Sequence, residues 1–174
     1  MEASLANELF RRQLASYASV HRDPRNKATH FVGIPIIVFS LLLALSLWKL
    51  NLGVGEDASM AMVIGVIAAL GWIALDLGIG LVMAALLLVA WYAAEALAGA
   101  LGHAGTWTAF GVLFVGGWVL QFLGHHYEGK RPALIDNIFQ AFVGPMFLVA
   151  EAMVVMGMRR DLAALMNEPA VTSR

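Results

Sequence analysis

Five histidines stand out in a chain that contains no cysteine. Four of them, His21, His30, His125 and His126, fall in two short polar segments. A carboxylate, Glu128, follows His125 by three residues. Two histidines with one carboxylate suit non-haem Fe(II), and three histidines suit iron, zinc or copper. These residue types therefore indicate a site for a divalent transition metal.

Each candidate also has a simpler explanation. A single histidine at a membrane interface is most often an ordinary polar side chain, and we interpret His103, isolated in a glycine-rich turn, in this way. His126 adjoins His125 and would point elsewhere on a helix. Glu128 could instead pair with a nearby cation, an interaction of little energetic value at the surface. Only convergence in space would make a metal site of these residues.

The elements that must position these residues are apolar helices. The chain is 60% hydrophobic and 13% charged, whereas soluble domains are about half apolar and about a quarter charged. Stretches of about 20 apolar residues form helices long enough to cross a bilayer. The sequence predicts a single all-α domain over 1–174, a polytopic membrane helix bundle with four to five hydrophobic helices. The stretches are Phe31–Leu50, Met60–Leu75, Ile79–Gly99, Gly105–Leu123 and Ile138–Met158.

The N-terminal region differs from the rest. Apolar residues recur at helical spacing among charged ones over residues 3–20, which predicts an amphipathic helix on the membrane surface. Pro24 ends this helix, and Asn26 is expected to cap the first membrane helix. The domain then divides into an interfacial helix with the first histidine motif (1–30), four spans (31–123), the second histidine motif (124–136), a fifth hydrophobic helix (137–158) and a polar tail (159–174).

The distribution of Lys and Arg predicts the topology. Five cations precede Phe31 and two lie in 124–136, whereas the connections at 49–59 and 100–104 hold one between them. Cytoplasmic segments carry this excess, and four spans return the chain to its starting side. The two histidine segments are therefore expected on the same, cytoplasmic face. Gly144, Pro145 and Glu151 interrupt the last stretch, so we expect it to be re-entrant or packed against the bundle.

Local spacing supports convergence of the two segments. Tyr17 and His21 are four residues apart, as are Gln121 and His125, so each pair shares a helix face. We expect His21, His30 and His125 to meet. The net charge of −1 excludes a basic nucleic-acid-binding surface, and no glycine-rich nucleotide motif is present.

Two stretches carry a family resemblance: YASVHRDPRNKATHFVGIP, which begins at Tyr17, and QFLGHHYEGKRPAL, which begins at Gln121. In this order, with apolar spans between them, they resemble the membrane family typified by the fungal enzyme that turns phytosphingosine into odd-numbered fatty acids. Its members are Fe(II)-dependent 2-hydroxy-fatty-acid dioxygenases of α-oxidation. The resemblance runs from Tyr17 to Glu151.

The resemblance implies Fe(II) held by His21, His30 and His125, while His126 falls on a variable position. Among the other matching polar positions, Glu128 is a ligand or a partner of one. The implied reaction consumes dioxygen, releases CO2 and shortens a 2-hydroxy long-chain fatty acid by one carbon, without 2-oxoglutarate. The remaining candidates are Tyr17, Asn26 and Gln121 for catalysis and Arg25, Lys27, Lys130 or Arg131 for the substrate carboxylate. The acyl chain is expected between the spans, where each buried methylene contributes about 0.8 kcal/mol.

Two alternatives remain open at this point. A di-iron hydroxylase or desaturase would need more histidines in several clusters, and a small transporter or metal-binding scaffold would need no dioxygen. The composition, rich in Ala, Gly and Leu and poor in Lys, favours a bacterial inner membrane over the endoplasmic reticulum. The sequence leaves the oligomeric state open, a homo-oligomer included.

Overall fold

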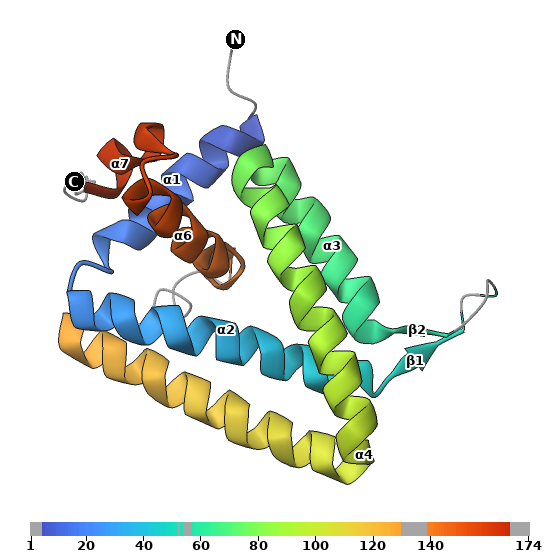
Figure 1. Ribbon diagram of the computed structural model, residues 1–174. Coiled ribbons are helices and arrows are strands. Elements are labelled where there is room, and N and C mark those ends of the chain that lie inside the picture. Colours follow the sequence, from blue (N-terminus) through green and yellow to red (C-terminus); the bar gives the residue numbers. More distant parts are fainter. Residues whose placement is uncertain (1–4, 52, 54–56, 130–138, 168–174) are drawn as a thin grey trace.

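The computed structural model describes residues 5–51, 53, 57–129 and 139–167, and it is built almost entirely from helices (Figure 1). The all-α class expected from the sequence is confirmed. The elements in chain order are α1 (Leu5–Ser19), α2 (Pro24–Ser46), β1 (Lys49–Leu50), β2 (Ala58–Ser59), α3 (Met60–Leu75), α4 (Leu77–Glu128), α6 (Phe139–Val155) and α7 (Arg160–Asn167).

The start of α2 is set by a proline. Pro24 occupies the first helical position, where its fixed φ fits the helix and its missing N–H costs nothing. The cap is the residue before it, because the Asp23 side chain accepts a 2.8 Å hydrogen bond from the Arg25 amide. The expectation that Asn26 caps this helix is wrong. Asn26 lies inside the first turn, and its side chain is free for other contacts.

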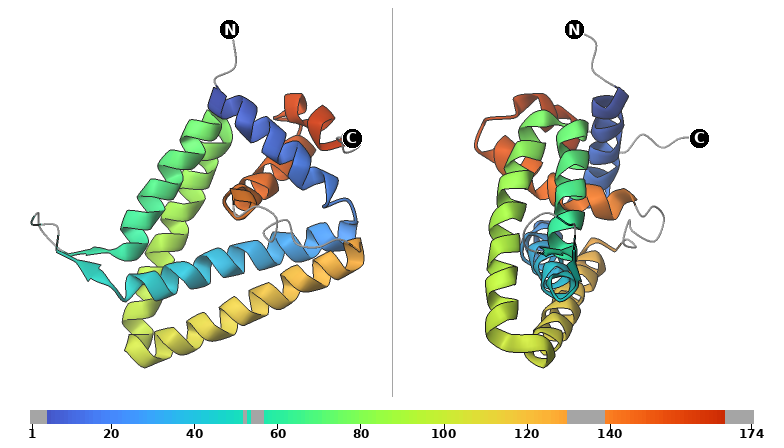
Figure 2. Two further views of the ribbon diagram at one scale, coloured as in Figure 1. Left: turned by 180° about the vertical axis from the view of Figure 1, so that it is seen from behind. Right: turned by 90° about the vertical axis from the view of Figure 1, so that its right-hand side faces the viewer.

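The third and fourth apolar stretches form one helix, α4, with a sharp break at Gly102. The backbone there has φ 67° and ψ −179°, a conformation that only glycine adopts readily. We call residues 77–101 the first arm of α4 and residues 103–128 the second arm. Figures 1 and 2 show the chain changing direction at this break. The glycine-rich turn expected around His103 is therefore reduced to a single residue, Gly102.

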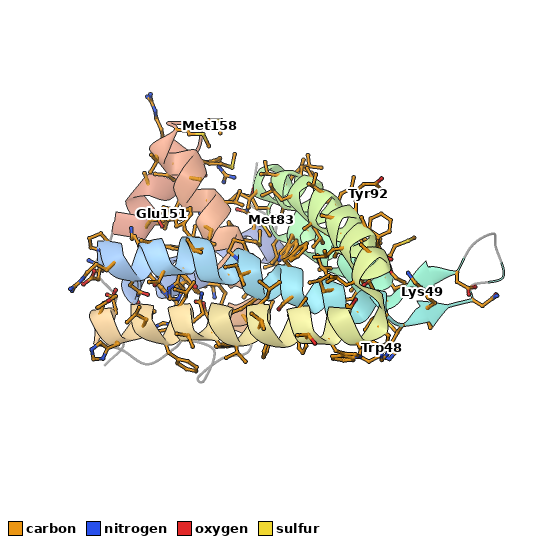
Figure 3. The ribbon with its side chains drawn as sticks, turned by 60° about the horizontal axis from the view of Figure 1, so that its bottom comes forward. Trp48, Lys49, Met83, Tyr92, Glu151 and Met158 are labelled. Atoms are coloured by element: carbon orange, nitrogen blue, oxygen red, sulfur yellow. The ribbon has the colours of Figure 1, made fainter. Side chains whose placement is uncertain are left out.

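The helices form two antiparallel pairs. One joins α3 to the first arm through Asp76, which ends α3 and caps α4 by accepting a 2.9 Å hydrogen bond from the Ile79 amide. The other places α2 beside the second arm, as Figures 1 and 3 both show. The separation expected between the stretches Met60–Leu75 and Ile79–Gly99 is confirmed at Asp76. The first arm thus has a short connection at each end, at Asp76 and at Gly102.

Glycines allow α2 and the second arm to approach closely. A Cβ atom on Gly117 would lie 2.6 Å from Ile37 Cγ1 and 3.2 Å from the Gly33 carbonyl oxygen. A Cβ atom on Gly124 would lie 3.0 Å from His30 Nδ1. Since real Cβ atoms are almost never that close to a neighbour, any larger residue would push the two helices apart. This contact fixes the distance between the polar ends of α2 and α4.

The helix expected near the N-terminus is present as α1, but its apolar face is buried in the protein. Phe10, Leu14 and Tyr17 are nearly inaccessible, because α1 packs on α6, α7 and α3. Near its start, Asn7 Nδ2 donates to Asp76 Oδ2 at 3.3 Å. Helix α1 therefore connects the Asp76 turn to the beginning of α2.

Two described helices, α2 and α4, are long and apolar enough to cross a membrane, and the number rises to three if α6 and α7 form one bent span. The bend between α6 and α7 is 117°. Glu151 of α6 pairs with Lys27 of α2, and Arg159 after α6 donates to Asp76 at 2.8 Å. These contacts tie the end of α6 to α2 and to the turn between α3 and α4. The re-entrant path of this last stretch stays a prediction.

The glycine contact gives a first test. Gly124→Ala should lower the free energy of unfolding by about 1–3 kcal/mol, because the added methyl group overlaps Asn26 and His30 of α2. Gly116→Ala is the matched control, since nothing lies within 4 Å of a Cβ atom at that position. Thermal unfolding in detergent measures both. Equal stability of the two variants would contradict the close packing described above.

Candidate metal centre

The structure brings His21, His30 and His125 together from three elements. His21 lies in the turn after α1, His30 in the second turn of α2 and His125 in the last turn of α4. All three are less than 8% exposed. His21 Nε2 and His30 Nε2 are 3.1 Å apart, and one ligand nitrogen from each ring lies within 4.8 Å of the other two. The three rings enclose a common point.

Backbone carbonyls orient two of these rings. His21 Nδ1 contacts the Tyr17 carbonyl oxygen at 2.8 Å, and His30 Nδ1 contacts that of Asn26 at 2.9 Å. A carbonyl only accepts hydrogen bonds, so each Nδ1 must carry the proton and donate. In the neutral rings, both Nε2 atoms then present lone pairs to each other. Metal-ligating histidines are commonly held in this way.

These lone pairs fit a metal ion. Two of them facing each other at 3.1 Å repel unless a cation or a proton lies between them. His125 adds a buried Nδ1 for which no hydrogen-bond partner exists among the described residues. Three imidazoles suit iron, zinc or copper. The donor set therefore fits a divalent transition metal.

The surroundings keep His21 neutral. Burial, and then the neighbouring ring of His30, lower the pKa of His21 to about 3. Tyr17 stacks on its ring at a centroid distance of 3.9 Å. An imidazole with so low a pKa is unprotonated at physiological pH, which is the form that binds a metal.

Glu128 holds the turn that carries His21. Its carboxylate accepts hydrogen bonds from the amides of Arg22 at 3.0 Å and Asp23 at 2.8 Å, and from Asn26 Nδ2 at 3.0 Å. It does not belong to the ligand group found among the described residues. In this structure, Glu128 binds the turn that carries His21 and so ties this turn to the end of α4. A role of Glu128 as a metal ligand stays a prediction.

The other candidates lie apart from the three rings. His126 is exposed and contacts the Tyr127 ring, while His103 is exposed beside the Gly102 break. Among the cations proposed for the substrate carboxylate, Arg25 pairs with Asp23 at 2.8 Å and Lys27 pairs with Glu151. Lys130 and Arg131 lie outside the described residues. The two described cations are thus already engaged.

A cavity of about 370 Å³ opens beside the three rings. Tyr17 and Gln121, both expected from the motifs, lie in its wall together with the three histidines. Most of the remaining lining is apolar and comes from α2, the second arm of α4 and α6. The contributing residues are Ile34, Ile37, Val38, Leu41, Phe114, Trp118, Gln140, Ala141, Gly144 and Pro145.

Reasoning from sequence assigned no role to two glycines beside the site or to Gln140 in the cavity wall. Gly33 and Gly124 make room beside Gln121 and His30, respectively. The seven-residue spacing of Gly117 and Gly124 on one helix face could have indicated this close contact. Gln140 carried no such signal, because its position depends on the placement of α6.

Fold and site together define an α-helical protein of membrane type, with a buried three-histidine centre beside an apolar cavity. Over residues 7–156 the chain matches the family model described as 2-hydroxy-palmitic acid dioxygenase Mpo1-like, and it belongs to this family. It is 32% identical over 163 residues to 2-hydroxy-palmitic acid dioxygenase MPO1 of Saccharomyces cerevisiae, covering 91% of this chain and 87% of the yeast protein. No solved structure matches. The family expected from the two motifs is confirmed.

The pKa of His21 predicts how stability depends on pH. The unfolded chain protonates His21 below about pH 6.5, whereas the folded chain does so only near pH 3. Stability of the metal-free protein should therefore fall on acidification through this window, by at most about 1.4 kcal/mol per pH unit from this group. Unfolding at pH 7.5 and pH 5.5 measures the slope. His21→Gln should reduce the slope without abolishing it, because burial also lowers the pKa of His30, to about 4. The exposed control His126→Gln should leave the slope unchanged, and equal slopes in all three proteins would disprove the prediction.

The hydrogen bonds between Glu128 and the turn that carries His21 give a further prediction. Glu128→Gln keeps the size of the side chain but replaces one acceptor oxygen with an NH2 group, so unfolding should require about 1–2 kcal/mol less. Glu8→Gln is the control, because Glu8 forms a surface pair with Arg12 and should contribute little. Denaturant titration in detergent compares the two. If the Glu128 variant were as stable as the Glu8 variant, Glu128 would not stabilise the turn that carries His21.

Proposed function

We propose that this protein is a membrane dioxygenase that converts 2-hydroxy fatty acids into acids one carbon shorter, using Fe(II) held by His21, His30 and His125. The observation that carries the proposal is the convergence of three neutral imidazoles at the wall of an apolar cavity. Membership of the Mpo1-like family and the name of the yeast relative support the substrate class.

The proposed reaction balances without a further redox partner. A 2-hydroxy acid and one O2 give the shortened acid, one CO2 and one water. The bond between the carboxyl carbon and C2 breaks, and C2 becomes the new carboxyl carbon. The acid loses four electrons, which O2 accepts, so neither 2-oxoglutarate nor a nicotinamide is required.

The residues of the chain hold and shield the centre. When bound, iron supplies the redox chemistry that allows dioxygen to react with the acid. The backbone carbonyls of Tyr17 and Asn26 accept hydrogen bonds from Nδ1 of His21 and of His30, respectively. The Nε2 atoms of these two rings therefore remain free to bind the metal. The apolar lining limits water at the site, which strengthens the electrostatic interactions made there.

The described residues of the cavity offer a carboxylate substrate neutral partners. Burial raises the pKa of Tyr17, so its hydroxyl stays protonated and does not act as a base. Among the described residues, the lining contains no Lys or Arg. The charge of the substrate carboxylate is therefore matched by the cation that the three histidines hold, in place of the Arg25 or Lys27 side chains considered above.

The alternatives are less well supported. A di-iron enzyme would need a larger set of ligands, but the described residues contain one group capable of holding a metal, with three histidines. A transporter or scaffold does not account for membership of a family of dioxygenases. We keep the scaffold as the outcome to be expected if metal binds but no oxygen is consumed.

We place the centre on the cytoplasmic face of a bacterial inner membrane. The composition, rich in Ala, Gly and Leu and poor in Lys, supports a bacterial membrane. The distribution of cations supports the cytoplasmic face: Lys49 lies at the far end of α2, as Figure 3 shows, whereas most described cations lie in α1, around the start of α2 and at the start of α7. These are Arg11, Arg12, Arg22, Arg25, Lys27, Arg159 and Arg160. Such an excess marks the cytoplasmic side.

Oxygen uptake tests the function directly. Purified protein with Fe(II) and 2-hydroxypalmitate should consume one O2 for each pentadecanoate formed, without an added reductant. His21→Ala, His30→Ala and His125→Ala should each abolish uptake and lower bound iron from one per chain to nearly zero. Metal analysis after anaerobic purification and an oxygen electrode give the two readings.

Two exposed histidines serve as controls. His103→Ala and His126→Ala should retain iron and activity, because neither ring contacts the centre. Uptake that requires an external reductant would point to a desaturase. Iron binding without any uptake would leave the scaffold as the explanation.

A further inference from the structure

The cavity beside the histidines has the dimensions and polarity of a site for an amphiphile. Its polar groups lie around His30 and His125, and its apolar lining extends to Leu41 on α2 and Phe114 on the second arm of α4. Each of these residues is eleven positions from the histidine on the same helix, which corresponds to about 16 Å of helix. Because the two helices are antiparallel, both distances run in the same direction away from the centre.

Gln121 provides an unused donor at the polar end. It lies one helical turn before His125, is 6% exposed, and lines the cavity. Its buried Nε2 has no hydrogen-bond partner among the residues that the structure describes. Gly33 faces this nitrogen so closely that a Cβ atom at Gly33 would collide with it. The glycine therefore makes space for an amide that no protein group binds.

The far end of the cavity is open. Leu41 lines the cavity and is 42% exposed, and Phe114 and Trp118 form a half-buried aromatic wall beside it. This end lies on the apolar outer surface of α2 and α4, the two helices long enough to cross a membrane. A chain that passes Leu41 therefore moves from apolar protein into apolar lipid.

A second cavity, of about 410 Å³, lies beside the first and shares Ile34, Val38 and Pro145 with it. Its lining, as far as the structure describes it, is apolar apart from the indole of Trp72, whose N–H already donates to the Phe142 carbonyl at 2.9 Å. Met83 and Leu87 are among its wall residues. Its described wall has no polar end that could hold an acid group, so we assign the substrate to the first cavity.

We propose that the first cavity is the acyl-chain site, in which Gln121 Nε2 donates a hydrogen bond to the 2-hydroxy-acid head and the tail leaves past Leu41 and Phe114 into the lipid. The choice of ligand rests on the proposed function. The cavity then sets a minimum chain length and no maximum. Each methylene up to Leu41 should improve kcat/KM about fourfold, and further methylenes should add little.

Photo-crosslinking of the wild-type protein tests the location without relying on turnover. The probe is a 2-hydroxypalmitate analogue with a diazirine at its terminal carbon, added without oxygen to the full chain in lipid nanodiscs. Mass spectrometry should find adducts near Leu41 and Phe114, and unlabelled 2-hydroxypalmitate should suppress them. Adducts near Met83 and Leu87, or adducts that no competitor suppresses, would overturn the assignment.

Variants test the two ends separately. Leu41→Trp should obstruct the exit and lower kcat/KM at least tenfold for acids of eighteen or twenty carbons relative to twelve, whereas Val115→Trp on the exposed face should preserve the wild-type profile. Gln121→Leu should weaken anaerobic binding of 2-hydroxypalmitate about tenfold, with the lipid-facing Phe122→Leu as control. An unchanged chain-length profile in Leu41→Trp would refute the exit of the tail past Leu41. An unchanged affinity in Gln121→Leu would refute the hydrogen bond from Gln121 to the acid head. Specific crosslinks without oxygen uptake would refute the proposed reaction and leave this site standing.

Discussion

The contact between α2 and the second arm of α4 at Gly33, Gly117 and Gly124 is the constraint on which the rest of the site depends. Without these glycines, side chains of ordinary size would separate the helices and draw His30 away from His125. Small residues serve this purpose in membranes because apolar helices gain nothing by excluding lipid from one another and associate through close packing. The same contact leaves room for the Gln121 amide.

A second set of polar contacts holds the remaining elements around this pair. Asp76 receives hydrogen bonds from Asn7 of α1 and from Arg159 after α6, so three segments distant in sequence meet at one carboxylate. At the other end of α1, Glu128 binds the turn before α2. Helix α1 is thus fixed at both ends, and His21, which follows it, is brought to the two histidines on the long helices.

The sequence allowed the convergence of histidines to be predicted, because cation bias and the number of apolar stretches together require His30 and His125 to lie at the same end of the bundle. Features set by tertiary packing were less accessible. The apolar side of α1 suggested a lipid surface, but α6, α7 and α3 pack against α1 and Phe10 and Leu14 are buried. No periodicity reveals which partner covers an apolar stripe. Glu128 and Asn26 were recognised as important, yet their hydrogen bonds to the 20–23 turn depend on distances that spacing alone does not supply.

The order of these residues along the chain dictates when the centre can form during synthesis. The ribosome makes His21 and His30 early, whereas His125 and the carboxylate of Glu128, which binds the Arg22 amide, follow roughly a hundred residues later. While the intervening segments are inserted, His21 and His30 lack the third histidine. The turn before α2 also lacks the Glu128 carboxylate that binds its amides. An ion that binds afterwards joins the beginning of the chain to the end of its fourth apolar stretch, so metal binding requires that the segments before α6 have already been placed.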